Sequence, residues 1–498
     1  MKLDKEKIKL WFKDPKNLLL VGILLFAAAI RIYYFFHTLD QPLWWDEADY
    51  TSTAKRIGLN LDVNDVWYYR RTFFLPLLWA GLFALGGGET TLRLTELIFS
   101  ISAVFLTYFV GKELFNKNIG LFAAFGLSIC RIHLFLTGRL LSSLPAATFI
   151  LAGLFFFWKG YIKKENTKYL LLAGLFFGLG FLTRLSTILS LIPLAVILLT
   201  TERFKFWKNK HILLSFLIVL LILSPFLYLY YAHYGGPLDF IKHYTGKAEY
   251  LEGIQLMGIS GIWQYFMNIL PNSSWPIFIF FLFGVVLLLL NLVGIDFIFK
   301  PEGEKIRKSL FIITWILIPI IVHGTTSVYL QERYLLLAYP LIFSVAGLGI
   351  AKTYNLVQKR GKTLAVAGLI LILAFSTYSQ ISTANDVIIL KKDSYLQVKQ
   401  SGEWLKANSV PGDVIISHSR QHNYYTERSV YSLTAYEKEF EEQFLPLNPK
   451  YFVVSVFEKH PEWAHTYAQR HNETMQPVKV YTLKEQPSLV IYEFLNRS

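Results

Sequence analysis

"QPLWWDEADY", residues 41–50, places two tryptophans and three carboxylates directly behind an apolar run at 17–37. The run has the length that a helix needs to cross a bilayer. Tryptophan is typical of the boundary between membrane and water, whereas a carboxylate costs up to about 3 kcal/mol if it is carried to the bilayer centre. The stretch therefore predicts a retained first membrane span, with no cleaved signal peptide, and acids at the interface that follows it.

The composition excludes a soluble protein. Of 498 residues, 54% are hydrophobic, 16% aromatic and only 17% charged, which is typical of a polytopic membrane protein. The net charge of +14 does not indicate nucleic-acid binding, because the lysines and arginines lie in short loops between apolar runs, where they act as topology signals. The single cysteine, Cys130, cannot form an intramolecular disulfide.

Hydropathy predicts about 11 spans, which we place near 17–37, 92–111, 119–136, 142–158, 169–183, 187–201, 211–231, 276–299, 309–323, 334–351 and 363–381. The first 16 residues and the loops at 112–118, 159–168, 203–210, 300–308 and 352–362 are rich in Lys and Arg. By the positive-inside rule these segments are cytoplasmic. The stretch at 41–50 and everything after the last span then lie outside the cytoplasm, in a cell membrane protein whose N-terminus is cytoplasmic.

The sequence divides into a transmembrane domain, 1–384, and an α/β domain, 385–498. Two extracytoplasmic loops of the first domain are long, at 38–91 and 232–275, and in the first loop we expect two helices, near 47–60 and 73–88, that lie in the interface. In the tail, alternating apolar residues predict strands near 414–419, 450–457, 478–483 and 488–494, with helices near 394–409, 436–444 and 461–472.

The acids of the quoted stretch have two interpretations. They are ordinary interfacial acids beside a tryptophan belt, or they act as a general base or orient a substrate at the membrane surface. Arginines near the ends of the outer loops favour the second, because their planar guanidinium groups suit phosphate oxygens. Each arginine alone is more simply explained by contact with lipid headgroups. For Glu332 and Arg333, which open a span, a structural ion pair and a phosphate ligand remain equal alternatives.

Several motifs together resemble one family. "WWDEADYTSTAKRI" (44–57) follows a first span, and "GGGETTLRL" (86–94), "LTGRLLSSLPAAT" (136–148), "GLFFGLGFLTRLS" (174–186) and "ERYLLLAYP" (332–340) come after it in order. This arrangement, over roughly residues 17–351, resembles the GT-C glycosyltransferases of the protein O-mannosyltransferase and aminoarabinose transferase type. The resemblance implies an enzyme that moves a sugar from a polyprenyl-phosphate carrier to an acceptor hydroxyl of a protein, lipid or glycan outside the cytoplasm.

The same resemblance implies roles for individual residues. Asp46 is the expected catalytic base, and Glu47 is its neighbour in the site. The resemblance also implies that Arg333 and other outward basic residues hold the carrier phosphate, for which we name Arg70, Arg71, Arg139 and Arg184. Glu332, at the start of a span, and His243, in the second outer loop, are added as substrate ligands from their positions. Many members carry an aspartate shortly after the arginine of the "GR" element, where this chain has Ser142 and Ser143, and Arg184 stands where a lysine is usual.

No cofactor is expected, because no glycine-rich phosphate loop follows any predicted strand. Asp46, Glu47 and Asp49 could form a hard-oxygen site for a divalent metal, but arginines alone can serve a monophosphate leaving group, so no metal is predicted. The main alternative function is a multi-span transporter or flippase of a lipid-linked or anionic substrate. Transporters carry polar residues near mid-span, whereas this chain concentrates them at one face.

Overall fold

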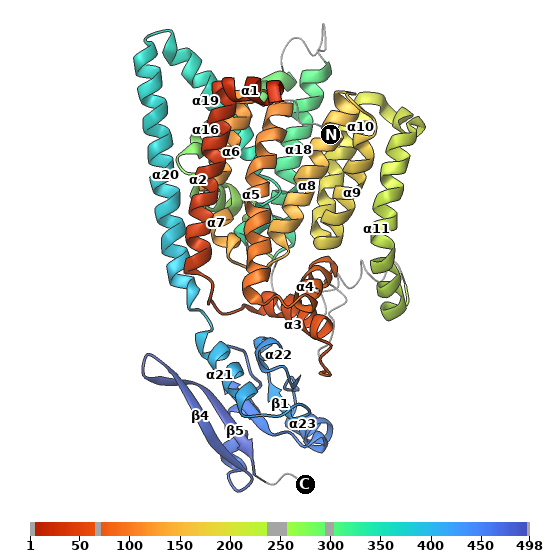
Figure 1. Ribbon diagram of the computed structural model, residues 1–498, viewed down its shortest axis with the longest axis vertical. Coiled ribbons are helices and arrows are strands. Elements are labelled where there is room, and N and C mark those ends of the chain that lie inside the picture. The colour runs from red at the N-terminus through yellow and green to blue at the C-terminus, as the bar shows by residue number, and fades with distance from the viewer. Residues whose placement is uncertain (1–4, 65–70, 237–255, 294–302, 496–498) are drawn as a thin grey trace.

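The computed structural model describes residues 5–64, 71–236, 256–293 and 303–495. Most of them form a bundle of long helices, and a small domain with a β-sheet lies beyond one end of that bundle (Figure 1). The short helix α1 (Lys5–Lys13) lies at the opposite end. The bundle and the small domain therefore define a long axis, with the chain's basic first helix and its C-terminal sheet at opposite ends.

Eight helical segments of the described chain are long and apolar enough to cross a membrane. Their bounds are Pro15–His37 (α2), Glu89–Leu114 (α5), Ser143–Ile162 (α8 and η1), Leu185–Lys208 (η2, α10 and η3), Lys210–Tyr234 (α11), Gly303–Thr326 (α18), Tyr339–Gln358 (α19) and Lys362–Ala407, which contains α20 (Lys362–Lys392) and α21 (Leu396–Ala407). Each coincides with a span predicted from hydropathy. The predicted fold class, a polytopic helical membrane protein with a small C-terminal α/β domain, is confirmed.

The other three predicted spans are broken or short. The span near 119–136 consists of α6 (Lys117–Ile129) and α7 (Arg131–Thr137), which meet at an angle of 58°. At the break the backbone N–H of Arg131 donates to Oε1 of Gln380, on α20, instead of to a helical carbonyl. The remaining two are α9 (Tyr169–Thr183) and α16 (Ile277–Val293). α9 is shorter than the roughly 20 residues of a typical span. The described part of α16 is also shorter, and the residues that follow Val293 lie outside the description.

Helices α16 and α19 pack so closely that glycine is required at the contact. A Cβ atom on Gly349 would collide with the backbone oxygen of Phe280, and one on Gly284 would collide with that of Val345. Small residues that let helix backbones approach are a common means of packing inside membranes, where lipid tails weaken the hydrophobic drive between helices. The two glycines thus fix the position of α19, which begins just after the "ERY" segment.

The small domain contains one five-stranded sheet in the order β2-β1-β3-β5-β4. Its strands are β1 (Val414–Ser417), β2 (Ser429–Tyr431), β3 (Tyr451–Ser455), β4 (Met475–Leu483) and β5 (Gln486–Phe494). β1 pairs in parallel with β2 and β3, whereas β5 pairs antiparallel with β3 and β4. Four of the five strands were predicted, and β2 was missed because three residues are too short for an alternating pattern. The predicted boundary at 385 falls inside α20, and the division into two domains stays a prediction.

Both faces of this sheet are covered, because neighbouring residues of β1 point into different cores. Ile415 packs with Val453 and Ile491 on one face, and Ile416 packs with Phe452 on the other. The covering helices are α21, α22 (Gln421–Thr426), α23 (Glu437–Phe444) and α24 (Glu462–Arg470). Short helix α22 contacts the first loop of the bundle.

The helices α3 (Trp45–Leu59) and α4 (Phe74–Ala84) correspond to the two interfacial helices expected in the first loop, but α3 is more buried than an interfacial helix would be. Every residue from Glu47 to Ala54 is buried, because α3 lies between the bundle and the small domain (Figure 1). Nζ of Lys55 lies 2.6 Å from Oε1 of Glu427, and the N–H of Leu43 donates to the Tyr425 hydroxyl at 2.9 Å. The small domain thus packs directly on the helix that carries the acids.

Because α16 and α19 are in close contact, we expect replacement of a glycine at this contact to destabilise the protein and replacement of a glycine elsewhere not to do so. Gly349→Ala should lower the thermal unfolding midpoint of the purified protein, because the methyl group forces the helices apart at a cost of about 1–3 kcal/mol. At Gly22, in α2, no atom lies within 4 Å of the added carbon. Gly22→Ala should therefore leave the midpoint unchanged or raise it. Equal shifts in the two variants would contradict the packing role of Gly349.

Candidate active site

The N-terminus of α3 holds Asp46 and Glu47 in its first turn. Carboxylates are favoured there, because the free N–H groups of the first turn leave a partial positive charge at a helix start. Oε2 of Glu47 accepts a hydrogen bond of 2.6 Å from the backbone N–H of Trp44, as the carboxylate of a capping box does. The local sequence alone therefore explains why a helix begins here and why its first acids are held rigidly.

Glu47 is fully buried and faces the interior of the bundle. Its second oxygen accepts from the backbone N–H of Leu140 at 2.8 Å, and Oε2 lies 3.3 Å from Nη1 of Arg139. Arg139 is itself 1% exposed, and its guanidinium carbon lies 3.9 Å from the centre of the Trp44 ring. Glu47 and Arg139 thus join the start of α3 to the segment after α7.

Asp46, one residue earlier, has a side chain that is 36% exposed and lies between two guanidinium groups. Its Oδ1 lies 2.7 Å from Nη2 of Arg71, and its Oδ2 lies 2.8 Å from Nη2 of Arg333. Burial alone would raise the pKa of Asp46, but Arg71 and Arg333 lower it, so that this pKa lies well below its usual range. Asp46 is therefore ionised and is held in place by two segments far apart in sequence.

The ion pairs continue from Asp46 into the small domain. Nη2 of Arg71 also lies 2.7 Å from Oδ2 of Asp49, and both oxygens of Asp49 accept from Nη1 of Arg420 at 2.8 Å. Arg333, Asp46, Arg71, Asp49 and Arg420 therefore form one row of alternating charges, which we call the charge ladder. It runs from the start of the "ERY" segment, across α3, to the loop after β1.

A small cavity adjoins the Arg333 end of the charge ladder. It is lined by Ser143, Arg184, Ser186, Thr187, His323, Arg333, Tyr334, Leu336 and Leu337, and its volume of about 10 Å³ holds about one water molecule. Arg184 donates to the hydroxyls of Ser143 and Ser186, both at 3.0 Å. Among the described residues Arg184 has no carboxylate partner. The cavity is thus lined by two guanidinium groups and several hydroxyl groups, which can all donate hydrogen bonds to an oxyanion.

The structure brings four of the predicted site residues together and places three in separate contacts. Asp46, Arg71, Arg184 and Arg333 surround one region. The three carboxylates that could form a hard-oxygen site, Asp46, Glu47 and Asp49, each pair with an arginine. Glu332 pairs with Arg131, and Glu47 pairs with Arg139. Arg70 and His243 lie outside the described residues.

Sequence reasoning missed Tyr334, His323 and Arg420 as members of this region. The Tyr334 ring stacks on His323 at 4.6 Å, and the guanidinium carbons of Arg184 and Arg333 lie 5.6 Å and 5.9 Å from the Tyr334 ring. Tyr334 belongs to the quoted "ERY" motif and could have been proposed from it. His323 lies in the last turn of an apolar helix and Arg420 in a distant domain, and no local pattern marks either residue.

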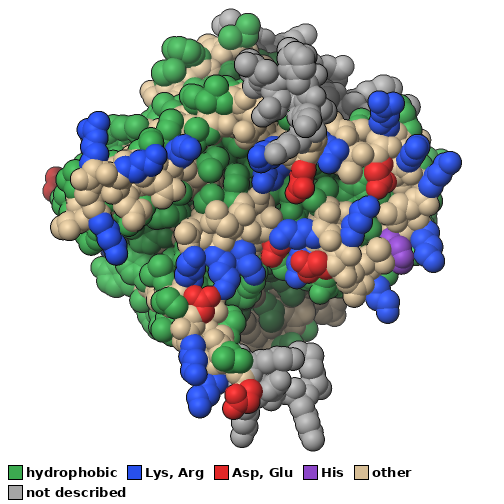
Figure 2. Space-filling model, turned by 90° about the horizontal axis from the view of Figure 1, so that it is seen from above, with side chains coloured by type: hydrophobic (Ala, Val, Ile, Leu, Met, Phe, Trp, Pro, Cys, Tyr) green, Lys and Arg blue, Asp and Glu red, His purple; other side chains and the backbone are tan. Residues whose placement is uncertain are grey.

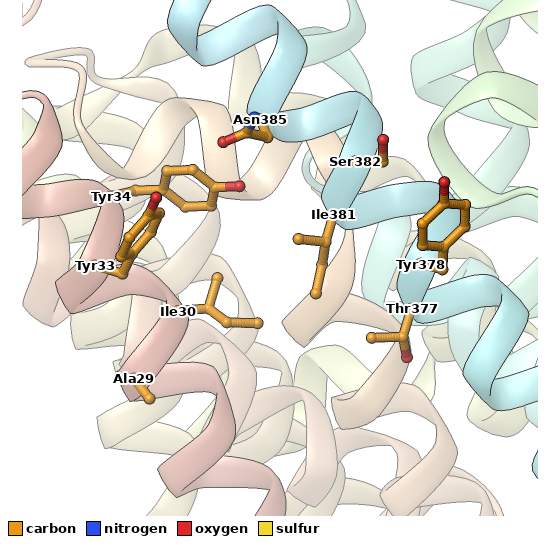
Figure 3. Close-up of a pocket in the computed structure, with 9 residues that line it drawn as sticks. All are labelled: Ala29, Ile30, Tyr33, Tyr34, Thr377, Tyr378, Ile381, Ser382 and Asn385. Atoms are coloured by element: carbon orange, nitrogen blue, oxygen red, sulfur yellow. The ribbon is translucent and has the colours of Figure 1, made fainter.

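A larger cavity, of about 610 Å³, lies between α2 and α20 (Figure 3). Its lining includes Tyr33, Tyr34, Tyr378, Ser382 and Asn385 and contains no charged residue. Size alone would favour this cavity as the site, but it contains none of the groups that can take a proton or neutralise a leaving group. The charge ladder and the cavity beside Arg184 are therefore the candidate active site.

Known proteins resemble this chain in fold. The structure of ArnT from Cupriavidus metallidurans bound to undecaprenyl phosphate superimposes with a TM-score of 0.65 at 13% identity, covering 94% of this chain and 98% of ArnT. The oligosaccharyltransferase of Archaeoglobus fulgidus, tethered with an acceptor peptide, gives a TM-score of 0.66 at 14% identity, with 96% of this chain and 74% of that protein covered. No curated protein matches the sequence.

The chain is thus a multi-pass membrane protein with the fold of the GT-C glycosyltransferases. Within it, residues 70–229 match the family described as dolichyl-phosphate-mannose-protein mannosyltransferase. The fold and this partial match agree with the glycosyltransferase that the motifs of the sequence predicted. The matched region includes Arg71, Arg139 and Arg184 but neither Asp46 nor Arg333, so it covers only part of the candidate site.

The burial of Glu47 predicts a structural effect when its charge is removed. Glu47→Gln should lower the unfolding midpoint strongly, because Arg139 is left as an uncompensated buried charge at a cost of about 3–5 kcal/mol. Glu442→Gln is the matched control, since Glu442 pairs with Lys438 on the exposed surface of α23, where such a pair contributes about 0.3–0.5 kcal/mol. A Glu47→Gln protein as stable as this control would contradict the assignment.

Proposed function

We propose that the protein transfers a sugar from a polyprenyl-phosphate carrier to an acceptor hydroxyl, with Asp46 as the general base. One observation carries this proposal: the Asp46 carboxylate is paired with Arg333, and Arg333 borders the cavity that contains Arg184. A base and a phosphate site thus lie side by side. The match to a mannosyltransferase family over residues 70–229 supports this class of reaction.

The transfer requires a base on one side of the anomeric carbon and a stabilised leaving group on the other. The acceptor oxygen bonds to the anomeric carbon and gives its proton to Asp46. The bond between the sugar and the phosphate oxygen breaks, and its electron pair stays on the carrier phosphate. Arg184 and Arg333 neutralise the charge that develops there. In this scheme Glu47 acts indirectly, because it positions the helix turn that presents Asp46.

The carrier is the best supported part of the substrate. ArnT has been solved with undecaprenyl phosphate, and the A. fulgidus oligosaccharyltransferase with dolichol-phosphate and an inhibitory peptide. A phosphate on a lipid tail would reach the cavity beside Arg184 at the end of the membrane spans, and the serine and threonine hydroxyls there can complete its hydrogen bonds. A protein, a lipid and a glycan all remain candidate acceptors.

The orientation in the membrane is also part of the proposal. Figure 2 shows the end of the molecule that bears α1, where Lys and Arg side chains outnumber acidic ones. Exposed cations of the short loops contribute to it, among them Lys164, Lys168, Arg203, Lys359 and Arg360. The positive-inside rule places this end in the cytoplasm. Asp46 and the small domain then face the extracytoplasmic side, where the carrier would present its sugar.

The rival function is a transporter or flippase of a lipid-linked or anionic substrate. Such a protein would move the lipid-phosphate sugar across the membrane without breaking its bond to phosphate. Reconstituted vesicles given a panel of radiolabelled lipid-phosphate sugars, with membrane extract as acceptor, separate the two functions. Label that reaches the acceptor supports the transferase, and label that changes leaflet while it stays on the carrier supports the rival.

Removal of the proposed base gives the most direct prediction. Asp46→Asn should lower sugar transfer by at least about 100-fold, because the amide cannot accept the proton of the acceptor. Asp40→Asn is the matched control: Asp40 is exposed in the same loop and should keep its transfer rate. Initial rates with the same donor and acceptor give the comparison, and a folded Asp46→Asn protein with undiminished turnover would refute the role of Asp46.

The phosphate site gives a separate prediction. Arg184→Gln should raise the KM for the lipid donor by about tenfold, because a charge-assisted contact to phosphate contributes about 1.5 kcal/mol or more. Arg360→Gln, at the opposite end of the bundle, controls for the loss of a positive charge and should leave this KM unchanged. An Arg184→Gln protein with an unaltered donor KM would place the phosphate elsewhere.

A further inference from the structure

Asp46 cannot act as a base in the arrangement that the structure shows. Arg71 occupies Oδ1 and Arg333 occupies Oδ2. A carboxylate that is paired with two guanidinium groups has little affinity for a proton, and each of its oxygens already accepts a guanidinium N–H. One of the two arginines must leave Asp46 before the proposed reaction can proceed.

The contacts of the two arginines show which one can leave. Arg71 is also paired with Asp49 at 2.7 Å, and its guanidinium carbon lies 5.0 Å from the centre of the Tyr50 ring. Asp49 is in turn bound by Arg420 of the small domain. Arg71 is therefore fixed from two sides. Arg333 has a neutral second partner, the side-chain oxygen of Gln331, and it borders the cavity.

The size of that cavity also requires a movement. A volume of about 10 Å³ holds a water molecule but not a phosphate group. Arg333 lines the cavity on the side of Asp46, and Arg184 lines it as well, held by serine hydroxyls. If Arg333 rotates from Asp46 into contact with an entering phosphate, the same movement opens space for the anion and uncovers Oδ2 of Asp46.

We propose that the carrier phosphate takes Arg333 from Asp46, so that Asp46 becomes a working base only when the donor is bound. Arg333 is thus a positioning residue for the base as well as a ligand of the phosphate. This inference rests on the proposed function and adds to it an order of events, in which the donor binds before the acceptor is deprotonated. When no donor is bound, a water molecule or an acceptor that reaches Asp46 is therefore not deprotonated.

The charges of the reaction agree with this exchange. The donor is a phosphodiester with one negative charge, and the carrier leaves as a monoester that gains a second. Meanwhile the acceptor proton neutralises Asp46. Negative charge thus disappears from Asp46 and appears on the phosphate, and Arg333 moves in the same direction. The other charged groups of the charge ladder, Arg71 and Asp49 with Arg420 behind them, keep their partners throughout.

The inference predicts that loss of the catalytic carboxylate improves carrier binding. Asp46→Asn should bind dolichyl phosphate about tenfold more tightly than the unchanged protein, because Arg333 no longer has a competing anion. The measurement is a titration of the full-length protein in lipid nanodiscs with dolichyl phosphate, and with dolichol as a control for the tail. Glu332→Gln is the matched control, since it releases Arg131 rather than Arg333, and it should give no such gain.

The same substitution made in an Arg333→Gln protein distinguishes the exchange of Arg333 from simple repulsion between Asp46 and the phosphate. In Arg333→Gln, which should bind the carrier more weakly, the additional change Asp46→Asn should give little further gain. A gain of the same size in both backgrounds would mean repulsion alone and would overturn the inference. Equal or weaker binding by Asp46→Asn would overturn it as well. If dolichyl phosphate bound to none of these proteins, the proposed function itself would fail.

Discussion

The ion pairs of Asp46 join three parts of the chain that are distant in sequence. Arg71 comes from the first loop, Arg333 from the segment before α19, and Asp49 links the same group to Arg420 of the small domain. Charges at the edge of an apolar bundle are stable only when they are paired, because the loss of hydration is otherwise not compensated. These ion pairs therefore link the first loop, the segment before α19 and the small domain to one another.

Asp46 and Glu47 illustrate how adjacent carboxylates acquire different roles. Glu47 is fully buried, and its oxygens accept from two backbone N–H groups and Arg139. Asp46 is partly exposed and is paired only with side chains, one of which borders a cavity. A helix turns by about 100° per residue, so neighbouring side chains point in different directions. In the proposed reaction, this difference in surroundings leaves Glu47 to support the helix and Asp46 to take the proton once Arg333 has left it.

The small domain packs on α3 and contributes Arg420 to the charge ladder. Its contacts with α3 and the loop before it include a buried tyrosine hydroxyl and the ion pair of Glu427 with Lys55. This packing buries the middle of α3, which its weakly amphipathic sequence does not suggest. In the proposed reaction an acceptor would approach Asp46 beside this domain, whereas the carrier would approach from the membrane. In that reaction the two substrates would approach Asp46 and the neighbouring phosphate site from different sides.

The sequence by itself determined the membrane class, the approximate places of the long apolar spans, four of the five strands and several candidate site residues. Apolar length, alternation and unusual charges at an interface are local properties. It also singled out Asp46, Arg184 and Arg333 through short motifs. Only the tertiary structure decided which acid meets which arginine, since those pairs join residues as far apart as 46 and 333 or 49 and 420. His323 and Arg420 have no local signal at all. Their proximity to the site depends on helix packing and domain docking, which no short stretch of sequence encodes.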